Sequence, residues 1–218
     1  MLPLWDANPP RRTPVMTVAL ITINTAVFVY QVRLALAGRV EPFVLEHALV
    51  PRRLLAGWAD GAQWLTVLTH LFLHGGLAHL LGNCWFLWIF GRGVEGRLGP
   101  FRFLGFYLLA GVAAAALQVG FTPDSPVPML GASGAISGVL GAYLLLFPMA
   151  WIYTLVPWIV PIVPVPALVF LALWFVLQAF NGFGSLPGGG VAWWAHVGGF
   201  VTGAWLALAA GGRRRTRR

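Results

Sequence analysis

The sequence predicts an all-α membrane protein, a bundle of six transmembrane helices with an interfacial loop between the first and second helices. Three observations favour this class. Of the 218 residues, 59% are hydrophobic and 9% are charged, whereas a soluble domain carries about 25% charged residues. Apolar segments recur along the chain, and a membrane-spanning helix needs about 20 mostly apolar residues. Arginines flank these segments in a pattern typical of topology signals.

We expect six spans within one membrane domain, because no 20–50-residue repeat or low-complexity linker divides the chain. The expected spans are residues 14–36, 76–92, 101–120, 133–148, 165–181 and 192–211. The corresponding division is an N-terminal segment 1–13, a membrane domain 14–211 and a basic tail 212–218. Several spans are short or contain glycine, which is common where helices pack inside a membrane protein.

The arginine distribution predicts the orientation. An even number of spans places both termini on one side, and ten of the fourteen arginines fall on that side. The positive-inside rule therefore puts both termini in the cytoplasm. The tail Arg213–Arg218 then faces lipid headgroups, and we expect no nucleic-acid partner. Residues 1–37 leave open a cleavable secretory signal, although their apolar stretch is long for one.

The long connection between the first two spans mixes aromatic residues such as Trp58, Trp64 and Phe43 with charged residues. This composition suits short amphipathic helices in the outer interface, where tryptophan is common at headgroup depth. An ordinary outer loop is the alternative.

Carboxylates are missing from the interior of every expected span. The six acidic residues lie at a terminus, in a loop or at a span edge: Asp6, Glu41, Glu46, Asp60, Glu95 and Asp124. Since ionisable groups inside spans usually mark function, these positions argue against an aspartyl-type intramembrane protease, a carboxylate proton relay and a full Ser-His-Asp triad. No HExxH string occurs, and a single cysteine, Cys84, excludes a disulfide framework. We expect no metal and no cofactor.

The polar residues that remain within the spans are serine, histidine and asparagine. Ser133 opens the fourth span in GASGAISG, and His196 lies near the outer end of the sixth span in AHVGGFVTG. His79 and Asn83, four residues apart, lie on one face of a helix in the second span. Small residues recur at helical spacing in the fourth and sixth spans, and such faces allow close packing. Packing of these faces would bring Ser133 and His196 together.

A hydroxyl within hydrogen-bond distance of an imidazole supplies a nucleophile and a general base, the minimum for acyl transfer. His79, Asn83 and the Ser133 backbone N–H could then donate hydrogen bonds to a developing oxyanion. The alternatives are that Ser133 only permits close packing and that His196 only bonds a neighbouring helix. His70 and His74 have the i, i+4 spacing of a metal site, although His79 lies off their face.

In this order, the residues resemble the rhomboid family of intramembrane serine proteases. The matches are GASG, from Gly131 to Gly134, for the family's GxSG; HLLGN, from His79 to Asn83, for HxxxN; and AHVGGFVTG for AHxxGxxxG. His70 and His74, and the E-x-R of VEGRLG after the second span, also fit. The resemblance covers about residues 58–205. These motifs are specific to the family when they occur together in this order, although GxSG alone is common.

The resemblance implies a compact six-helix bacterial enzyme of the inner membrane, multi-pass and embedded in the lipid bilayer. It implies a catalytic dyad of Ser133 and His196, with an oxyanion site of His79, Asn83 and the Ser133 backbone. The supporting residues it implies are Gly131, Gly134, Gly199, Gly203, Glu95 and Arg97. The implied substrate is a transmembrane protein whose helix unwinds into an outward-opening cavity and is cleaved near its outer end. The loop between the first and second spans resembles part of the family's lateral gate and cap, as does the fifth span with the loop at residues 181–191.

Two positions depart from the family pattern. Trp64 is followed by Leu65, where many members carry arginine, so the polar anchoring of the first loop is open. Ser137 stands where some members have a tyrosine that stacks on the catalytic histidine. Two other functions remain as alternatives: a non-proteolytic rhomboid-like protein that binds membrane clients, and a small channel or metal transporter that uses the histidines.

Overall fold

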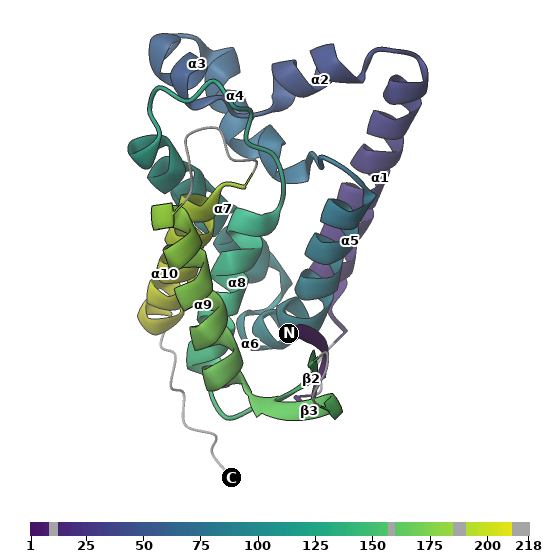
Figure 1. The fold of residues 1–218 in the computed structure, drawn as a ribbon, viewed down its shortest axis with the longest axis vertical. Coiled ribbons are helices and arrows are strands. Elements are labelled where there is room, and N and C mark those ends of the chain that lie inside the picture. The colour runs from purple at the N-terminus through teal and green to yellow at the C-terminus, as the bar shows by residue number, and fades with distance from the viewer. Residues whose placement is uncertain (9–12, 157–159, 185–190, 211–218) are drawn as a thin grey trace.

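Apolar helices make up most of the computed structural model, which describes residues 1–8, 13–156, 160–184 and 191–210. The helices, with the 3₁₀ turn η1 and the π-helical turn η2, are α1 (Val15–Leu36), α2 (Val40–His47), α3 (Pro51–Ala56), α4 (Gly61–Thr69), η1 (His70–Phe72), α5 (Leu77–Phe86), η2 (Leu87–Gly91), α6 (Arg92–Leu98), α7 (Pro100–Phe121), α8 (Ser133–Leu146), α9 (Ala167–Gly184) and α10 (Trp193–Ala209). The strands are β1 (Leu2–Asp6), β2 (Trp151–Val156) and β3 (Val160–Pro166). The long helices run side by side, and α2 to α4 lie at one end of them (Figure 1).

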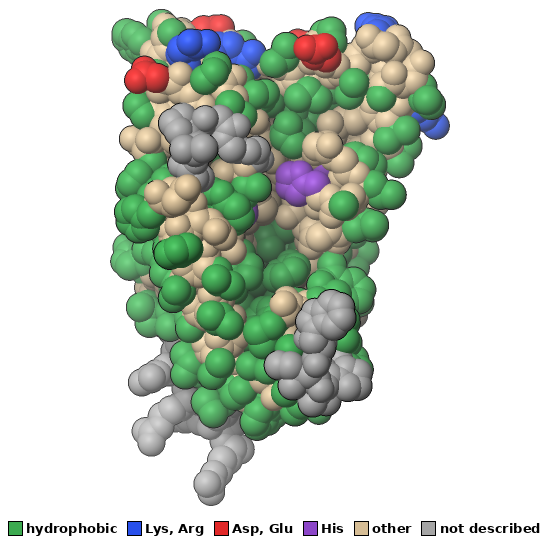
Figure 2. Space-filling view, viewed as in Figure 1, with side chains coloured by type: hydrophobic (Ala, Val, Ile, Leu, Met, Phe, Trp, Pro, Cys, Tyr) green, Lys and Arg blue, Asp and Glu red, His purple; other side chains and the backbone are tan. Residues whose placement is uncertain are grey.

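Within the described residues, three helices are long and apolar enough to cross a membrane: α1, α7 and α9. The segments Gly61–Phe72 and Leu77–Leu98 meet at a bend of 79° and form a fourth spanning element if they are taken as one. Figure 2 shows apolar side chains along the flanks, with charged side chains gathered at the end formed by α2 to α4. The chain is therefore a multi-pass membrane protein, as the composition predicts.

α8 is the central helix of the bundle. Every side chain from Gly134 to Tyr143 is buried, and α8 packs against both α7 and α10. Its 14 residues span about 21 Å at 1.5 Å per residue, less than the roughly 30 Å of a bilayer's hydrocarbon core. A short helix surrounded by protein can begin below the membrane surface, and Ser133 is its first residue.

The connection after α1 folds into the short helices α2, α3 and α4, as the sequence predicts for an interfacial segment. The Arg53 side chain ties them together: it donates hydrogen bonds to the backbone oxygen atoms of Leu45 and Ala48 and to Oε1 of Gln63. Trp58 and Trp64 are more than half exposed at this end, where indole rings can sit at headgroup depth. Arg53 thus supplies polar anchoring that Leu65 does not.

A three-stranded antiparallel sheet, in the order β1-β2-β3, lies at the opposite end and is absent from the all-α expectation. The run WIYTLV in β2 is rich in β-branched and aromatic residues, which favour strands. β3 contains several prolines, which are tolerated because it is an edge strand. β3 occupies the start of the span predicted at 165–181, so α9 begins at Ala167.

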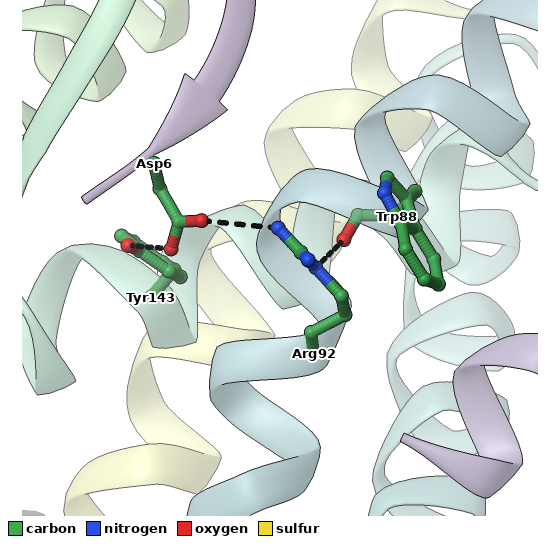
Figure 3. A network of polar contacts seen from close by, with 4 residues as sticks. All are labelled: Asp6, Trp88, Arg92 and Tyr143. Atoms are coloured by element: carbon green, nitrogen blue, oxygen red, sulfur yellow. Dashed lines mark hydrogen bonds and ion pairs between the residues drawn. The ribbon is translucent and has the colours of Figure 1, made fainter. Parts of the chain in front are cut away.

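A polar network joins this sheet to the helices (Figure 3). Asp6 at the end of β1 pairs with Arg92, at 3.3 Å between Oδ1 and Nη2, and accepts a hydrogen bond of 2.7 Å from the Tyr143 hydroxyl of α8. Arg92 also donates from Nε to the Trp88 backbone oxygen, at 2.7 Å. The side chain of Asp6 is almost fully buried, so these partners compensate for the cost of removing its charge from water.

The helix that begins with α5 continues through η2 and α6 to Leu98, beyond the end expected at residue 92. Glu95 is buried and caps α1: its carboxylate accepts hydrogen bonds of 2.7–2.8 Å from the backbone N–H groups of Met16 and Thr17 and from the Thr17 hydroxyl. A carboxylate at a helix N-terminus satisfies free N–H groups and interacts favourably with the helix dipole.

Candidate active site

Glycines bring α8 and α10 into backbone contact. A Cβ on Gly199 would collide with the Gly134 carbonyl oxygen, and one on Gly203 would collide with the carbonyl oxygen of Gly138. On the other side of α8, a Cβ on Gly134 would come within 2.8 Å of the Ala114 methyl group of α7. The glycines at these positions are therefore required for the observed spacing, as the small-residue pattern predicts.

This packing places the first residue of α8 beside the first turn of α10. The Ser133 Oγ and the His196 Nε2 are 2.9 Å apart and form a hydrogen bond. Both side chains are only partly buried, so a ligand can reach them. A hydroxyl bonded to a neutral imidazole nitrogen can give up its proton as it attacks an electrophile.

Hydrogen-bond donors surround the N-terminus of α8. Gly131 has a positive φ of 121°, and a Cβ there would lie 2.7 Å from the His79 ring and 3.6 Å from the Asn83 amide nitrogen. The Asn83 Nδ2 is buried without a hydrogen-bond partner among the residues that the structure describes, and a buried unpaired donor is costly. The first backbone N–H groups of a helix are also free of helical partners. An anion at this point would accept hydrogen bonds from all three sources.

Two tryptophans and a glutamine surround the His196 ring. The ring centroids of Trp174 on α9 and Trp193 on α10 each lie 6.0 Å from it, tilted and edge-on respectively. The Gln178 Oε1 of α9 lies 2.8 Å from the His196 Nδ1. Ser137, by contrast, donates its hydroxyl hydrogen to the Ser133 backbone oxygen at 2.7 Å, so it supports α8 and leaves the ring to the other residues.

The site lies beside a hollow in the molecular surface. Figure 2 shows a histidine side chain exposed at this hollow, between the half of the molecule that carries α9 and the half that carries α5. His79 on α5 and His196 on α10 are both partly exposed, and their helices come from these two halves (Figure 1).

Other residues from the sequence analysis lie outside this cluster. Glu95 caps α1, and the Arg97 guanidinium lies 6.0 Å from the Phe147 ring. His70 uses its Nδ1 to donate to the Thr66 backbone oxygen, at 2.9 Å. No group of three metal-ligating side chains occurs in the part of the chain that the structure describes. The basic tail and most of residues 181–191 lie outside that part.

Gln178, Trp174 and Trp193 are the site residues that sequence reasoning missed. The partner of a catalytic histidine is usually an ionisable carboxylate, and an amide is not ionisable. The signal was present in LALWFVLQAF, where one amide interrupts an apolar helix. Trp174 and Gln178 are four residues apart, so they share a helix face.

Comparisons with known proteins identify the family of the chain. Residues 61–213 match the model of the Rhomboid domain. The chain is 46% identical over 82 residues to the rhomboid protease GluP of Bacillus subtilis, a match that covers 38% of this chain and 16% of GluP. It is 29% identical over 212 residues to the rhomboid protease AarA of Providencia stuartii, covering 89% of this chain and 72% of AarA. It is 31% identical over 162 residues to the mitochondrial rhomboid protein 1 of Saccharomyces cerevisiae, covering 71% of this chain and 45% of that protein.

Proposed function

Since the chain belongs to the rhomboid family, we propose that it is an intramembrane serine endopeptidase with Ser133 as nucleophile and His196 as general base. The observation that carries the proposal is the 2.9 Å hydrogen bond between Ser133 Oγ and His196 Nε2, next to the unpaired buried donor of Asn83. Two relatives of the chain are named rhomboid proteases, which supports proteolysis as the activity.

The reaction begins when His196 Nε2 takes the Ser133 hydroxyl proton as Oγ attacks the scissile carbonyl carbon. The carbonyl oxygen becomes an oxyanion, which accepts hydrogen bonds from Asn83, His79 and the backbone N–H of Ser133. His196 then gives the proton to the departing amine, leaving an acyl-enzyme on Ser133. A water molecule, deprotonated by His196, hydrolyses that ester and restores the hydroxyl. Each oxyanion donor of this kind typically contributes about 2.7–4 kcal/mol of transition-state stabilisation.

The position of the site supports a transmembrane substrate. Ser133 begins a helix too short to cross the bilayer by itself, and a substrate helix must unwind for its peptide bond to reach the hydroxyl. In this proposal residues 14–211 form a membrane domain of six spans, which places both termini in the cytoplasm of a bacterial inner membrane. Cleavage then occurs near the outer end of the substrate helix. The hollow in Figure 2 is where the unwound segment enters.

The test is cleavage of a model transmembrane substrate in proteoliposomes. Ser133→Ala is expected to abolish cleavage, because no other hydroxyl contacts His196 among the residues described. Ser137→Ala is the matched control: it removes a hydroxyl one turn along α8 that bonds only to backbone, and it is expected to retain cleavage. Undiminished cleavage by Ser133→Ala would disprove the assignment of the nucleophile.

A further inference from the structure

The His196 ring is held at both nitrogens, by residues from two different helices. Its Nε2 faces Ser133 of α8 at 2.9 Å, and its Nδ1 faces Oε1 of Gln178 on α9 at 2.8 Å. Gln178 is 9% exposed and lies on the inner face of a helix whose outer residues are apolar. From this arrangement we propose that Gln178 is a positioning residue that fixes the reactive tautomer of His196. The inference rests on the proposed function and adds a third residue to the Ser133–His196 pair.

The chemistry follows from the amide oxygen. A glutamine Oε1 only accepts hydrogen bonds, so the nitrogen that faces it must carry a proton. With the proton on Nδ1, the neutral ring has its lone pair on Nε2, directed at the Ser133 hydroxyl, which is the tautomer that a general base requires. When Nε2 takes the serine proton, Nδ1–H still has its acceptor, and the amide dipole stabilises the positive ring.

In soluble serine proteases a buried carboxylate performs this task. The acidic residues of this chain are outside the site, and an ionised group within a membrane is costly. A neutral amide supplies the acceptor without that cost. Trp174, one turn before Gln178, contacts the same ring, so one face of α9 sets both the tautomer and the tilt of the imidazole.

The reactive arrangement therefore depends on the position of α9. This helix lies at the edge of the bundle. Of its 18 residues 28% are buried, compared with 44% of the most apolar 18 residues of α7. An outward shift of α9 by about 1 Å would take Oε1 beyond hydrogen-bond distance of Nδ1. An outward movement of α9 of this size would therefore release the base, and its return would restore the reactive tautomer.

The experiment compares Gln178→Met, which removes the acceptor at similar length, with Gln178→Glu, which keeps it. Leu171→Ala is the control for loosened packing, because Leu171 is a buried residue of α9 two turns from Gln178. One readout is the rate at which a fluorophosphonate labels Ser133. The other is the tautomer of His196, read from the ¹⁵N NMR shifts of histidine-labelled protein in micelles, with His196→Ala for assignment.

Wild type is expected to show protonated Nδ1 and unprotonated Nε2. Gln178→Met should lose this preference and label about 10-fold more slowly or worse, as expected for one lost buried hydrogen bond and a wrong tautomer. Gln178→Glu should label within a few-fold of wild type at pH 8, with its acidic limb moved to higher pH, since a carboxylate favours the imidazolium. His79 on α5 is the titratable residue that interacts electrostatically with the His196 ring, and it is unchanged in each of these variants. Leu171→Ala should keep the wild-type tautomer.

The inference would be overturned if Gln178→Met were labelled at the wild-type rate, or if His196 kept its wild-type tautomer in that variant. Equal losses in Gln178→Glu and Gln178→Met would also overturn it, because they would mean that the amide donates to Nδ1. If wild type fails to label at Ser133, the proposed function fails instead. The tautomer of His196 can still be read in that case, so the two failures are distinguishable.

Discussion

Replacing Gly199 by alanine is expected to separate the two proposed catalytic residues without touching either. A Cβ at Gly199 would collide with the Gly134 carbonyl oxygen. Both sides of this contact are anchored to backbone, so no side-chain rotation relieves it. To reach an ordinary carbon–oxygen contact, α8 and α10 must move apart by at least about 1 Å. Gly134 directly follows Ser133, and Gly199 lies one turn after His196.

The same displacement would lengthen the hydrogen bond between Ser133 Oγ and His196 Nε2 from 2.9 Å to about 3.9 Å, beyond hydrogen-bond distance. A misplacement of 1 Å can cost about 100-fold in rate, and overpacking costs about 1–3 kcal/mol of stability. We therefore expect kcat to fall about 100-fold in proteoliposomes, in a protein that still folds.

Gly105→Ala provides the matched control. Gly105 lies within α7, and a Cβ there would have no atom within 4 Å. The same chemical change should therefore leave kcat at the wild-type value and, if anything, raise helix stability. The apparent melting temperature in detergent separates a lost site from a lost fold. Wild-type kcat in Gly199→Ala would refute the claim that this glycine contact sets the dyad distance.

Two further variants test the proposed oxyanion donor Asn83 and the cap of α1. Asn83→Ala should lower kcat by about 100- to 1,000-fold with a much smaller change in KM, since the donor acts on the oxyanion; an unchanged kcat would remove Asn83 from the oxyanion site. Glu95→Gln should lower the free energy of unfolding by about 1.5–3 kcal/mol, because its carboxylate accepts three hydrogen bonds at the start of α1. Glu41→Gln, at an exposed position, is the control and should change stability by no more than about 0.5 kcal/mol; equal losses in the two variants would contradict the capping role.

Sequence periodicity predicted the features that depend on local chemistry. The apolar segments, the small-residue faces of α8 and α10, and the positions of Ser133 and His196 at neighbouring helix starts all follow from residue spacing. The interfacial helices after α1 follow from the mixture of tryptophan and charged residues. Membership of the rhomboid family, expected from the ordered set of short sequences, is confirmed by the match over residues 61–213.

The features that were missed depend on contacts between distant segments. Glu95 caps α1 by bonding to Met16, 79 residues before it, and no local pattern specifies that partner. The sheet needs β1 to pair with β2 across about 150 residues, and prolines such as those of β3 disfavour strands. Gln178 contacts His196 only because α9 packs beside α10. An amide in an apolar helix indicates a polar partner, but its identity comes from tertiary packing.

The central claim is that Ser133 is a nucleophile activated by His196. The most direct measurement is labelling of the purified protein by a fluorophosphonate, with the modified residue located by mass spectrometry in wild type, Ser133→Ala and His196→Ala. We predict one adduct per wild-type chain on Ser133, no adduct in Ser133→Ala, and labelling slowed by about 100-fold or more in His196→Ala. Labelling of Ser133→Ala at the wild-type rate, or of His196→Ala as fast as wild type, would contradict the account.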